Sequence, residues 1–258
     1  GDDWYLYSDR PLLVDYTHFS NVTIRTPARV LTPGALWSQW NFVRWARQDG
    51  VDLFWSPRHH LPVFLPMKMK KLLTIHDLVW LRYPRTMKPL GWILELLLMP
   101  ISLFLADRIV AVSKFSASEV SKTFHIRASR IDTIPQAAFE LTTERESDLP
   151  QDILKQNYFL FVGTPEPRKN LDRLLKAYKS FLEKGLTNNP MVYIVGSSGW
   201  GSEISSTIKS LALNEQVLVL DKINDPALQQ IYKHALALLL PSLYEGFGLP
   251  VLESMHAG

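Results

Sequence analysis

Short apolar segments alternate with longer amphipathic segments along most of the 258-residue chain. Several apolar segments contain almost no polar residue over four or five positions, which is typical of strands buried on both faces of a parallel sheet. The longer segments have the apolar spacing of helices. The pattern predicts strands at 4–7, 51–55, 71–75, 108–112, 130–134, 158–162, 191–195, 217–220 and 235–240, and helices at 36–48, 88–106, 116–124, 171–184, 201–211, 226–234 and 250–257.

This regular alternation predicts an α/β fold built from doubly wound parallel sheets. The segment 142–152 is polar and contains Pro150, as a linker would, and a new strand–turn–helix pattern begins at Tyr158. We therefore expect two Rossmann-like domains, residues 1–140 and residues 141–258.

One segment, 89–105 (PLGWILELLLMPISLFL), is apolar except for Glu95 and Ser102. Its length approaches that of a membrane span, but Glu95 and Pro100 argue against one. Three interpretations are open at this point: a helix buried against the sheet, a helix lying on a membrane surface, and a true span.

Composition narrows the class of protein. The chain has no cysteine, which excludes disulfides and thiolate metal sites, and its first residues do not have the pattern of a signal peptide. We expect a cytoplasmic protein. The net charge of +3 is too small to indicate nucleic-acid binding.

The charge is unevenly distributed. Residues 1–134 carry 17 Lys and Arg against 11 Asp and Glu, a net +6, whereas residues 135–258 carry 11 against 14, a net −3. The basic half is either an ordinary solvated surface or a face for an anionic partner, such as the inner face of the cell membrane in peripheral contact.

A first candidate binding motif, GTPEPRKN at 163–170, follows a predicted buried strand. Gly163 allows a tight turn, and Asn170 is expected to cap the next helix. Arg168 and Lys169 then lie just before a helix N-terminus, where two cations and backbone N–H groups suit a phosphate or diphosphate. The alternative is a capped helix with two solvated cations.

A second motif, PSLYEGFGLPVLE at 241–253, follows another apolar strand. Gly246 and Gly248 allow close approach of a ligand to the backbone, and Pro250 suits the first position of a helix. Glu245 lies on this loop, and Glu253 is expected in the first helical turn, where favourable interaction with the helix dipole also explains it. Carboxylates so placed can accept hydrogen bonds from sugar hydroxyls.

The string PSLYEGFGLPVLESMHAG resembles the E-x7-E region of glycosyltransferase family 4, the retaining group 1 transferases. VGTPEPRKNLDRLLKAY resembles the diphosphate-binding turn of that family, and TIHDLVWLRYP and ADRIVAVSKFSASEV resemble its N-terminal domain. The resemblance implies a GT-B fold, with two Rossmann-like domains facing across a cleft. The chain is most similar to members that transfer hexoses, often mannose from GDP-mannose, in surface polysaccharide assembly.

The resemblance also implies roles for individual residues. Glu245 would contact the donor hexose, Glu253 the ribose hydroxyls, and His76 the donor sugar from the N-terminal domain, although a lone histidine at a strand end is often structural. The remaining donor-binding positions would be the diphosphate-binding residues Arg168, Lys169 and Gly163, and the backbone amides of Gly246, Phe247, Gly248 and Leu249.

The expected partners are a nucleotide-sugar donor and a saccharide or lipid-linked acceptor. The chain has no D-x-D motif, so we expect neither a metal nor any cofactor besides the donor. Thr164 stands where many members have arginine, which leaves Arg168 and Lys169 to neutralise the diphosphate. The chain resembles a fragment of a family member that lacks both the N-terminal and the C-terminal end. A sugar-nucleotide epimerase and an inactive nucleotide-sugar-binding module are the alternative functions.

Overall fold

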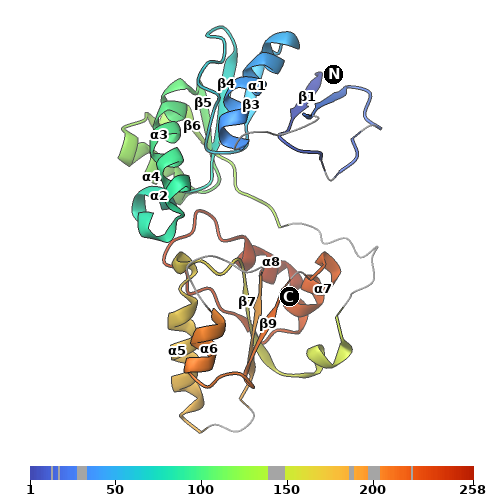
Figure 1. Cartoon of the computed structure of the whole chain (residues 1–258), viewed down its shortest axis with the longest axis vertical. Coiled ribbons are helices and arrows are strands. Elements are labelled where there is room, and N and C mark those ends of the chain that lie inside the picture. Colours follow the sequence, from blue (N-terminus) through green and yellow to red (C-terminus); the bar gives the residue numbers. More distant parts are fainter. Residues whose placement is uncertain are drawn as a thin grey trace. The chain divides into compact units, whose positions relative to one another are not determined.

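The computed structural model describes residues 1–258 apart from 13, 17, 28–33, 139–148, 186–188, 197–203 and 222 (Figure 1). The chain divides into two compact units. The N-terminal unit comprises Gly1–Leu78 and Pro89–Pro135, and the C-terminal unit comprises Val79–Lys88 and Gln136–Gly258. The domain boundary predicted between residues 140 and 141 lies outside the described residues.

The N-terminal unit contains a four-stranded parallel sheet in the order β3-β4-β5-β6. Two further strands, β1 and β2, form a separate parallel pair. The second of these was not predicted, because four residues flanked by polar ones give too short a pattern. The elements are β1 (Trp4–Tyr7), β2 (Val22–Arg25), α1 (Gly34–Gln48), β3 (Leu53–Ser56), β4 (Lys70–Ile75), α3 (Pro89–Leu105), β5 (Arg108–Ala111), α4 (Lys114–Phe124), η2 (Ala128–Arg130) and β6 (Ile131–Thr133).

Helix α3 is the apolar segment singled out in the sequence, and it is half-buried. Its buried side chains are Met99, Ser102 and Leu103. The exposed ones follow a helical spacing of three and four residues and so share one face; they are Leu90, Ile93, Leu97, Ile101 and Phe104, with Leu96 beside them. None of the helices in the described part of the chain is long and apolar enough to cross a membrane.

The C-terminal unit contains a second four-stranded parallel sheet, in the order β10-β7-β8-β9. The unit includes the segment between β4 and α3, which contains α2 (Val79–Arg82) and η1 (Pro84–Thr86). Its other elements are η3 (Gln151–Lys155), β7 (Tyr158–Val162), η4 (Pro167–Lys169), α5 (Leu171–Leu182), β8 (Met191–Val195), α6 (Ile204–Ser210), β9 (Val217–Leu220), α7 (Asp225–His234), β10 (Ala237–Leu238) and α8 (Leu249–Ala257). The helix predicted at 201–211 corresponds to α6, and the first residues of the predicted range, 201–203, lie outside the described residues.

Both faces of this sheet are covered, as the uninterrupted apolar strands predicted. Alternate strand side chains point to opposite faces. Phe161 and Ile194 pack with α5 and α6, whereas Leu160 and Tyr193 pack with α7. Figure 1 shows α5 and α6 side by side along one face of the sheet.

The strand order places a topological switch point between β7 and β10. From β7 the chain proceeds through α5 to β8 on one side, and it returns through α7 to β10 on the other side. Open α/β sheets bind ligands at such a point, in the crevice beyond the carboxyl ends of the strands. The two motifs found in the sequence directly follow these two strands.

Candidate active site

The loops after β7 and β10 are joined by main-chain and side-chain hydrogen bonds. The Leu243 N–H donates to the Arg168 carbonyl at 2.8 Å, and Asn170 Nδ2 donates to the Pro241 carbonyl at 3.1 Å. Because β7 and β10 are parallel neighbours, their carboxyl ends lie at the same edge of the sheet. The two motifs, more than 70 residues apart in sequence, therefore form a single site.

At this site one carboxylate bridges two cations. Lys169 Nζ lies 2.6 Å from Glu245 Oε1, and Arg168 Nη1 lies 3.2 Å from Glu245 Oε2. Arg168 Nε also donates to Glu166 Oε2 at 3.0 Å. The site thus holds two positive and two negative side chains. The alternative of two solvated cations is wrong for Lys169, which is 8% exposed.

The Glu245 carboxyl group is ionised at neutral pH. Burial alone would raise its pKa, but the hydrogen bond from Lys169 and the charge of Arg168 lower the pKa below its usual value. A partly buried carboxylate kept anionic between two cations can either hold those cations in place or accept a hydrogen bond from a ligand hydroxyl.

Two glycines allow the backbone to close around this site. Gly163 directly follows β7 and has φ of +143°, a conformation that favours glycine, and its N–H donates to the Val195 carbonyl at 2.9 Å. A side chain at Gly196, after β8, would collide with the Gly163 carbonyl oxygen. Gly163 was identified from the sequence but Gly196 was missed, although a glycine directly after a buried strand was a usable signal.

Asn170 does not cap α5 as predicted. It occupies the N-cap position in a left-handed conformation, with φ of 60°, and its side chain makes no capping hydrogen bond. Its amide instead donates to Pro241 on the neighbouring loop. The reason is that the short η4 turn before α5 turns the Asn170 side chain toward the β10 loop.

The second acid, Glu253, lies on α8 beyond the first turn and not within it, because the helix begins at Leu249. Tyr232 donates its hydroxyl proton to Glu253 Oε2 at 2.6 Å. Burial and this hydrogen bond both raise the pKa of Tyr232, so the hydroxyl stays a donor. Tyr232 orients Glu253, a contact that the sequence could not indicate because the two residues come from different helices.

The glycine-rich loop places the other predicted positions at the start of α8. Gly246, Phe247 and Gly248 precede the helix, and Leu249 is its first residue. Gly248 has φ of +92°, which favours glycine, and its carbonyl accepts from the Val251 N–H at 3.0 Å. The loop therefore leads directly into a helix N-terminus, whose partial positive charge suits an anionic ligand.

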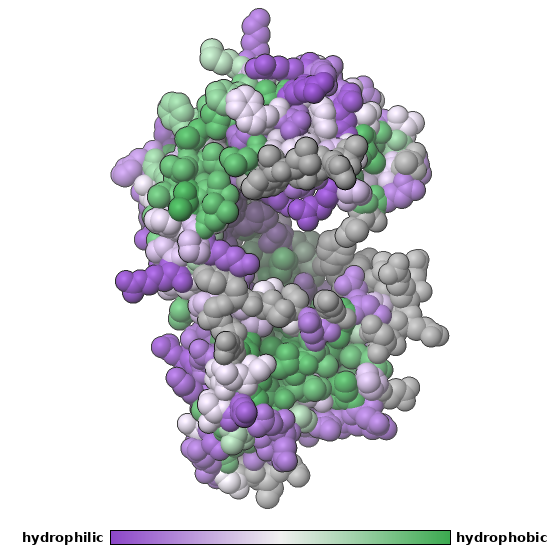
Figure 2. Space-filling view, in the orientation of Figure 1, coloured by the Kyte–Doolittle hydropathy of each residue, from purple (hydrophilic) through white to green (hydrophobic). Residues whose placement is uncertain are grey.

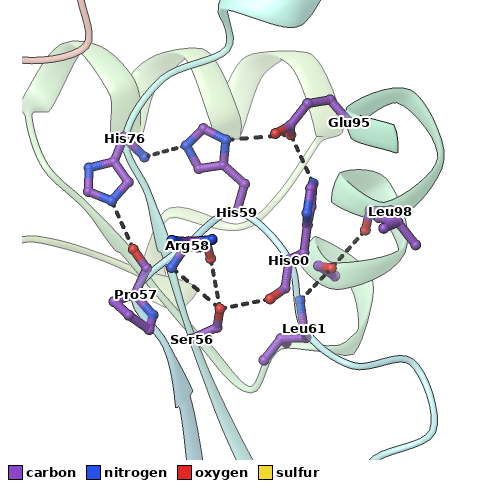
Figure 3. Close-up of polar contacts among 10 residues, drawn as sticks. Ser56, Pro57, Arg58, His59, His60, Leu61, His76, Glu95 and Leu98 are labelled. Carbon is purple, nitrogen blue, oxygen red and sulfur yellow. Dashed lines mark hydrogen bonds and ion pairs between the residues drawn. The ribbon is translucent and has the colours of Figure 1, made fainter. Parts of the chain in front are cut away.

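The last predicted residue, His76, lies in the N-terminal unit, immediately after β4 (Figure 3). Its Nε2–H donates to the Pro57 carbonyl at 2.9 Å, and its main-chain carbonyl accepts from Ser116 Oγ at 2.9 Å. The main-chain N–H donates to His59 Nε2 at 3.1 Å. His76 is thus held at its ring and at both main-chain groups.

Comparison with known proteins identifies the family and the fold of the chain. A family model described as "Glycosyltransferase Family 4" matches residues 6–137, and one described as "Glycosyl transferases group 1" matches residues 144–258. The chain aligns with sucrose-phosphate synthase of Thermosynechococcus elongatus at a TM-score of 0.70 and 18% identity, covering 99% of this chain and 68% of that one. It aligns with the lipopolysaccharide glycosyltransferase WaaG at 0.66 and 15%, covering 98% and 70%.

The fold is therefore that of the GT-B glycosyltransferases. Because the first family model covers half of the residues, the chain belongs to glycosyltransferase family 4.

Sequence relatives include O-antigen mannosyltransferases. The chain is 31% identical to O-antigen chain mannosyltransferase B of Escherichia coli over 83% of this chain and 57% of that protein. It is 25% identical to O-antigen chain mannosyltransferase RfbU of Salmonella typhimurium over 85% of this chain and 58% of that protein. The chain thus spans rather more than half the length of the curated relatives it matches.

Proposed function

We propose that the protein is a retaining hexosyltransferase and that the C-terminal unit binds its nucleotide-sugar donor. The observation that supports this most directly is the bridging of Arg168 and Lys169 by Glu245 at the switch point of the sheet. The two cations and the start of α8 suit the donor diphosphate. Glu245 would face the transferring sugar, and Glu253, oriented by Tyr232, would accept hydrogen bonds from the ribose hydroxyls.

GDP-mannose is the proposed donor and mannose the transferred sugar, because proteins similar to most of the chain are mannosyltransferases. The acceptor would be a saccharide or a lipid-linked saccharide in the assembly of a surface polysaccharide. Calorimetry with GDP-mannose, GDP-glucose, UDP-glucose and UDP-galactose tests the base and the hexose separately. Tighter binding of both UDP-sugars than of GDP-mannose would refute the proposed donor.

We assign stabilisation of the diphosphate leaving group to cationic side chains of the protein and not to a metal ion. Arg168 and Lys169 supply two positive charges where the diphosphate would lie, and preorganised charges of this kind stabilise a developing negative charge effectively. Transfer should then continue in the presence of EDTA. Complete loss of transfer in EDTA, restored by Mg²⁺ or Mn²⁺, would contradict this assignment.

Two other functions are distinguished by one assay. An epimerase would convert the sugar nucleotide without an acceptor, and an inactive binding module would bind it without change. Radiolabel transfer from the donor to a saccharide acceptor, with the nucleotide products separated, tells the three apart. The intact cluster of Arg168, Lys169 and Glu245 favours the transferase. In a module that only binds a diphosphate, a carboxylate that competes with the ligand for both cations would weaken binding and give no benefit.

We further propose that α3 contacts an anionic membrane surface, where a lipid-linked acceptor would lie. The two polar residues of the helix, Glu95 and Ser102, hydrogen-bond or ion-pair with the protein interior, on the side where Met99 and Leu103 are also buried. Its exposed face is apolar instead, and Phe104 is 83% exposed. Figure 2 shows hydrophobic residues gathered over the part of the N-terminal unit where Figure 1 has α3.

Charge complementarity selects an anionic membrane as the partner of this face. Residues 1–134 carry a net +6. Three of these cations, Arg82, Arg85 and Lys88, come shortly before the helix in sequence, although they fold with the C-terminal unit. Each basic residue near an anionic leaflet contributes about 1 kcal/mol. Lys71, which the sequence groups with Lys68 and Lys70, does not contribute, because its ammonium is buried and donates to the Met69 carbonyl at 2.8 Å.

Co-sedimentation with vesicles tests the proposed contact. Binding should require anionic lipid, decrease with salt, and weaken both in Phe104→Ser and when Arg82, Arg85 and Lys88 are changed to serine. Val219→Ser is the matched control, since Val219 is also an exposed apolar residue but lies on β9 of the other unit. Equal binding to neutral and anionic vesicles, or the same loss in the control, would refute the membrane contact.

A further inference from the structure

Two consecutive histidines and one glutamate form a cluster in the N-terminal unit, whereas the cations of the donor site belong to the C-terminal unit (Figure 3). His59 and His60 follow β3, and Glu95 points at them from α3. Glu95 Oε2 lies 3.5 Å from His59 Nδ1 and 3.1 Å from His60 Nε2. All three side chains are more than three-quarters buried.

His59 connects this carboxylate to His76. Its Nε2 accepts a hydrogen bond from the His76 main-chain N–H at 3.1 Å. A ring nitrogen that accepts cannot carry a proton, so the proton of the neutral His59 ring lies on Nδ1, the atom that faces Glu95. The carboxylate therefore favours the one tautomer of His59 that can hold the His76 main chain.

The His76 ring is fixed by a contact of the same loop. Its Nε2–H donates to the Pro57 carbonyl at 2.9 Å, which in the neutral ring leaves Nδ1 as the acceptor atom. The rings of His59 and His76 lie 5.6 Å apart between centroids. Movement of His59 would thus disturb both the main chain and the ring environment of His76.

A purely packing role for Glu95 does not explain its charge. Burial alone would raise its pKa, yet His59 and His60 lower the pKa to about 2, so the group is ionised at neutral pH. An apolar residue would fill the same space without the cost of burying a charge. The other polar residue of α3, Ser102, holds the same loop independently, because its Oγ accepts from the Leu61 N–H at 2.8 Å.

Nor does the cluster have the arrangement of a metal site. His59 Nε2 is occupied by the His76 N–H. Across the part of the chain that the structure describes, no group of three or more His, Asp or Glu side chains could hold a metal ion.

We propose that Glu95 is a positioning residue for sugar transfer: it holds His59 in the Nδ1–H tautomer, and His59 in turn fixes the segment that carries His76. The inference rests on the proposed transferase function and on the role in transfer that the family resemblance implies for His76. The contact of Glu95 with His59, and the hydrogen bond from the His76 main chain to His59, exist whether or not the protein transfers a sugar.

The experiment compares Glu95→Leu, Glu95→Gln and the control Ser102→Ala. In Glu95→Gln the new amide oxygen can still accept from His59 Nδ1–H, whereas the leucine side chain of Glu95→Leu cannot. Ser102→Ala removes a buried hydrogen bond between α3 and the same loop but leaves the connection from Glu95 to His76 intact. Long-range ¹H–¹⁵N NMR spectra report the tautomer of His59, and the amide resonance of His76 reports its hydrogen bond.

In the wild-type protein we expect His59 as the Nδ1–H tautomer and a downfield His76 amide. Glu95→Leu should lose both signatures and lower kcat about 10-fold or more through misplacement of His76. Its affinity for nucleoside diphosphate should not change, because that site lies in the C-terminal unit. Glu95→Gln should restore the tautomer and most of kcat, and Ser102→Ala should lower thermal stability without changing either.

An Nε2–H tautomer of His59 in the wild type, or unchanged His59 and His76 signals in Glu95→Leu, would overturn the proposal. The wild-type and Glu95→Gln spectra remain decisive if Glu95→Leu does not fold. If the wild-type protein transfers no sugar, the proposed function fails while the NMR result still decides whether Glu95 positions His76.

Discussion

Replacing Glu245 with glutamine should make the protein bind a nucleoside diphosphate more tightly while it transfers sugar more slowly. Glu245 bridges Lys169 at 2.6 Å and Arg168 at 3.2 Å. A diphosphate that needs these two cations must compete with the carboxylate for them. Glutamine has nearly the same shape but no charge, so it competes less strongly.

The size of the effect follows from the charges at the site. Arg168 and Lys169 are balanced by Glu166 and Glu245, and the substitution changes the sum from zero to +1. A hydrogen bond to a charged group contributes about 1.5–3 kcal/mol, and a neutral amide acceptor retains roughly half of that. We therefore expect diphosphate binding to strengthen by about 1–2 kcal/mol, or roughly 5- to 30-fold.

Isothermal titration calorimetry with GDP and UDP, at low and moderate salt, measures this change. Glu253→Gln is the matched control: the same chemical change on a carboxylate that contacts Tyr232 should not raise the affinity. Transfer activity is measured in parallel, because the carboxylate is proposed to act beside the transferring sugar. Equal or weaker GDP binding in Glu245→Gln would refute the idea that the carboxylate holds the two cations in competition with the ligand.

Three further outcomes are expected. Lys169→Ala should weaken diphosphate binding by about 1.5–3 kcal/mol, and unchanged affinity in both it and Arg168→Ala would remove the diphosphate from this site. Glu245→Gln should lower kcat far more than Glu253→Gln, which should mainly weaken donor binding; equal effects on kcat would contradict the division of roles. The pKa of Glu95 is depressed from 4.5 to about 2. The ionised carboxylate therefore stabilises the folded protein by on the order of 3 kcal/mol above pH 4.5, and this stabilisation is lost as the pH falls toward 2. Denaturant unfolding of Glu95→Gln should lack that part of the pH dependence, and parallel curves for the two proteins would show that Glu95 is not stabilised in its ionised form.

The buried strands were the most predictable part of the fold. β7, β8 and β9 have the predicted bounds. In β7 and β8 the reason is that residues covered by helices on both faces must be apolar without interruption. β10 is shorter than the apolar segment around it, since the residues after Leu238 leave the sheet for the glycine-rich loop while remaining partly buried. An apolar pattern records burial and not strand pairing, which is why β2 was missed and β10 was overestimated.

The site was predictable as two separate motifs but not as a set of contacts. Glu245 pairs with Lys169 and Arg168, which precede it in the sequence by 76 and 77 positions. This pairing depends on β10 lying next to β7, which no local pattern reveals. Glu95 drew attention in the sequence only as an argument against a membrane span. Its pairing with His59 and His60 brings together a helix and a loop whose adjacency is a property of the folded unit.

The short pairing of β10 with β7 has a consequence for motion. Ala237 and Leu238 pair as strand residues, and the chain beyond them is attached by two main-chain hydrogen bonds, from Leu239 to the Leu160 carbonyl and from Leu243 to the Arg168 carbonyl. The side-chain contacts of Asn170 with Pro241, and of Arg168 and Lys169 with Glu245, join the same two loops. Neither loop at the switch point can open without breaking the attachments of the other, so the two should exchange amide hydrogens as one cooperative unit. An anion bound by the cations of one loop would then slow hydrogen exchange in the other loop as well, although the two are encoded far apart in the sequence.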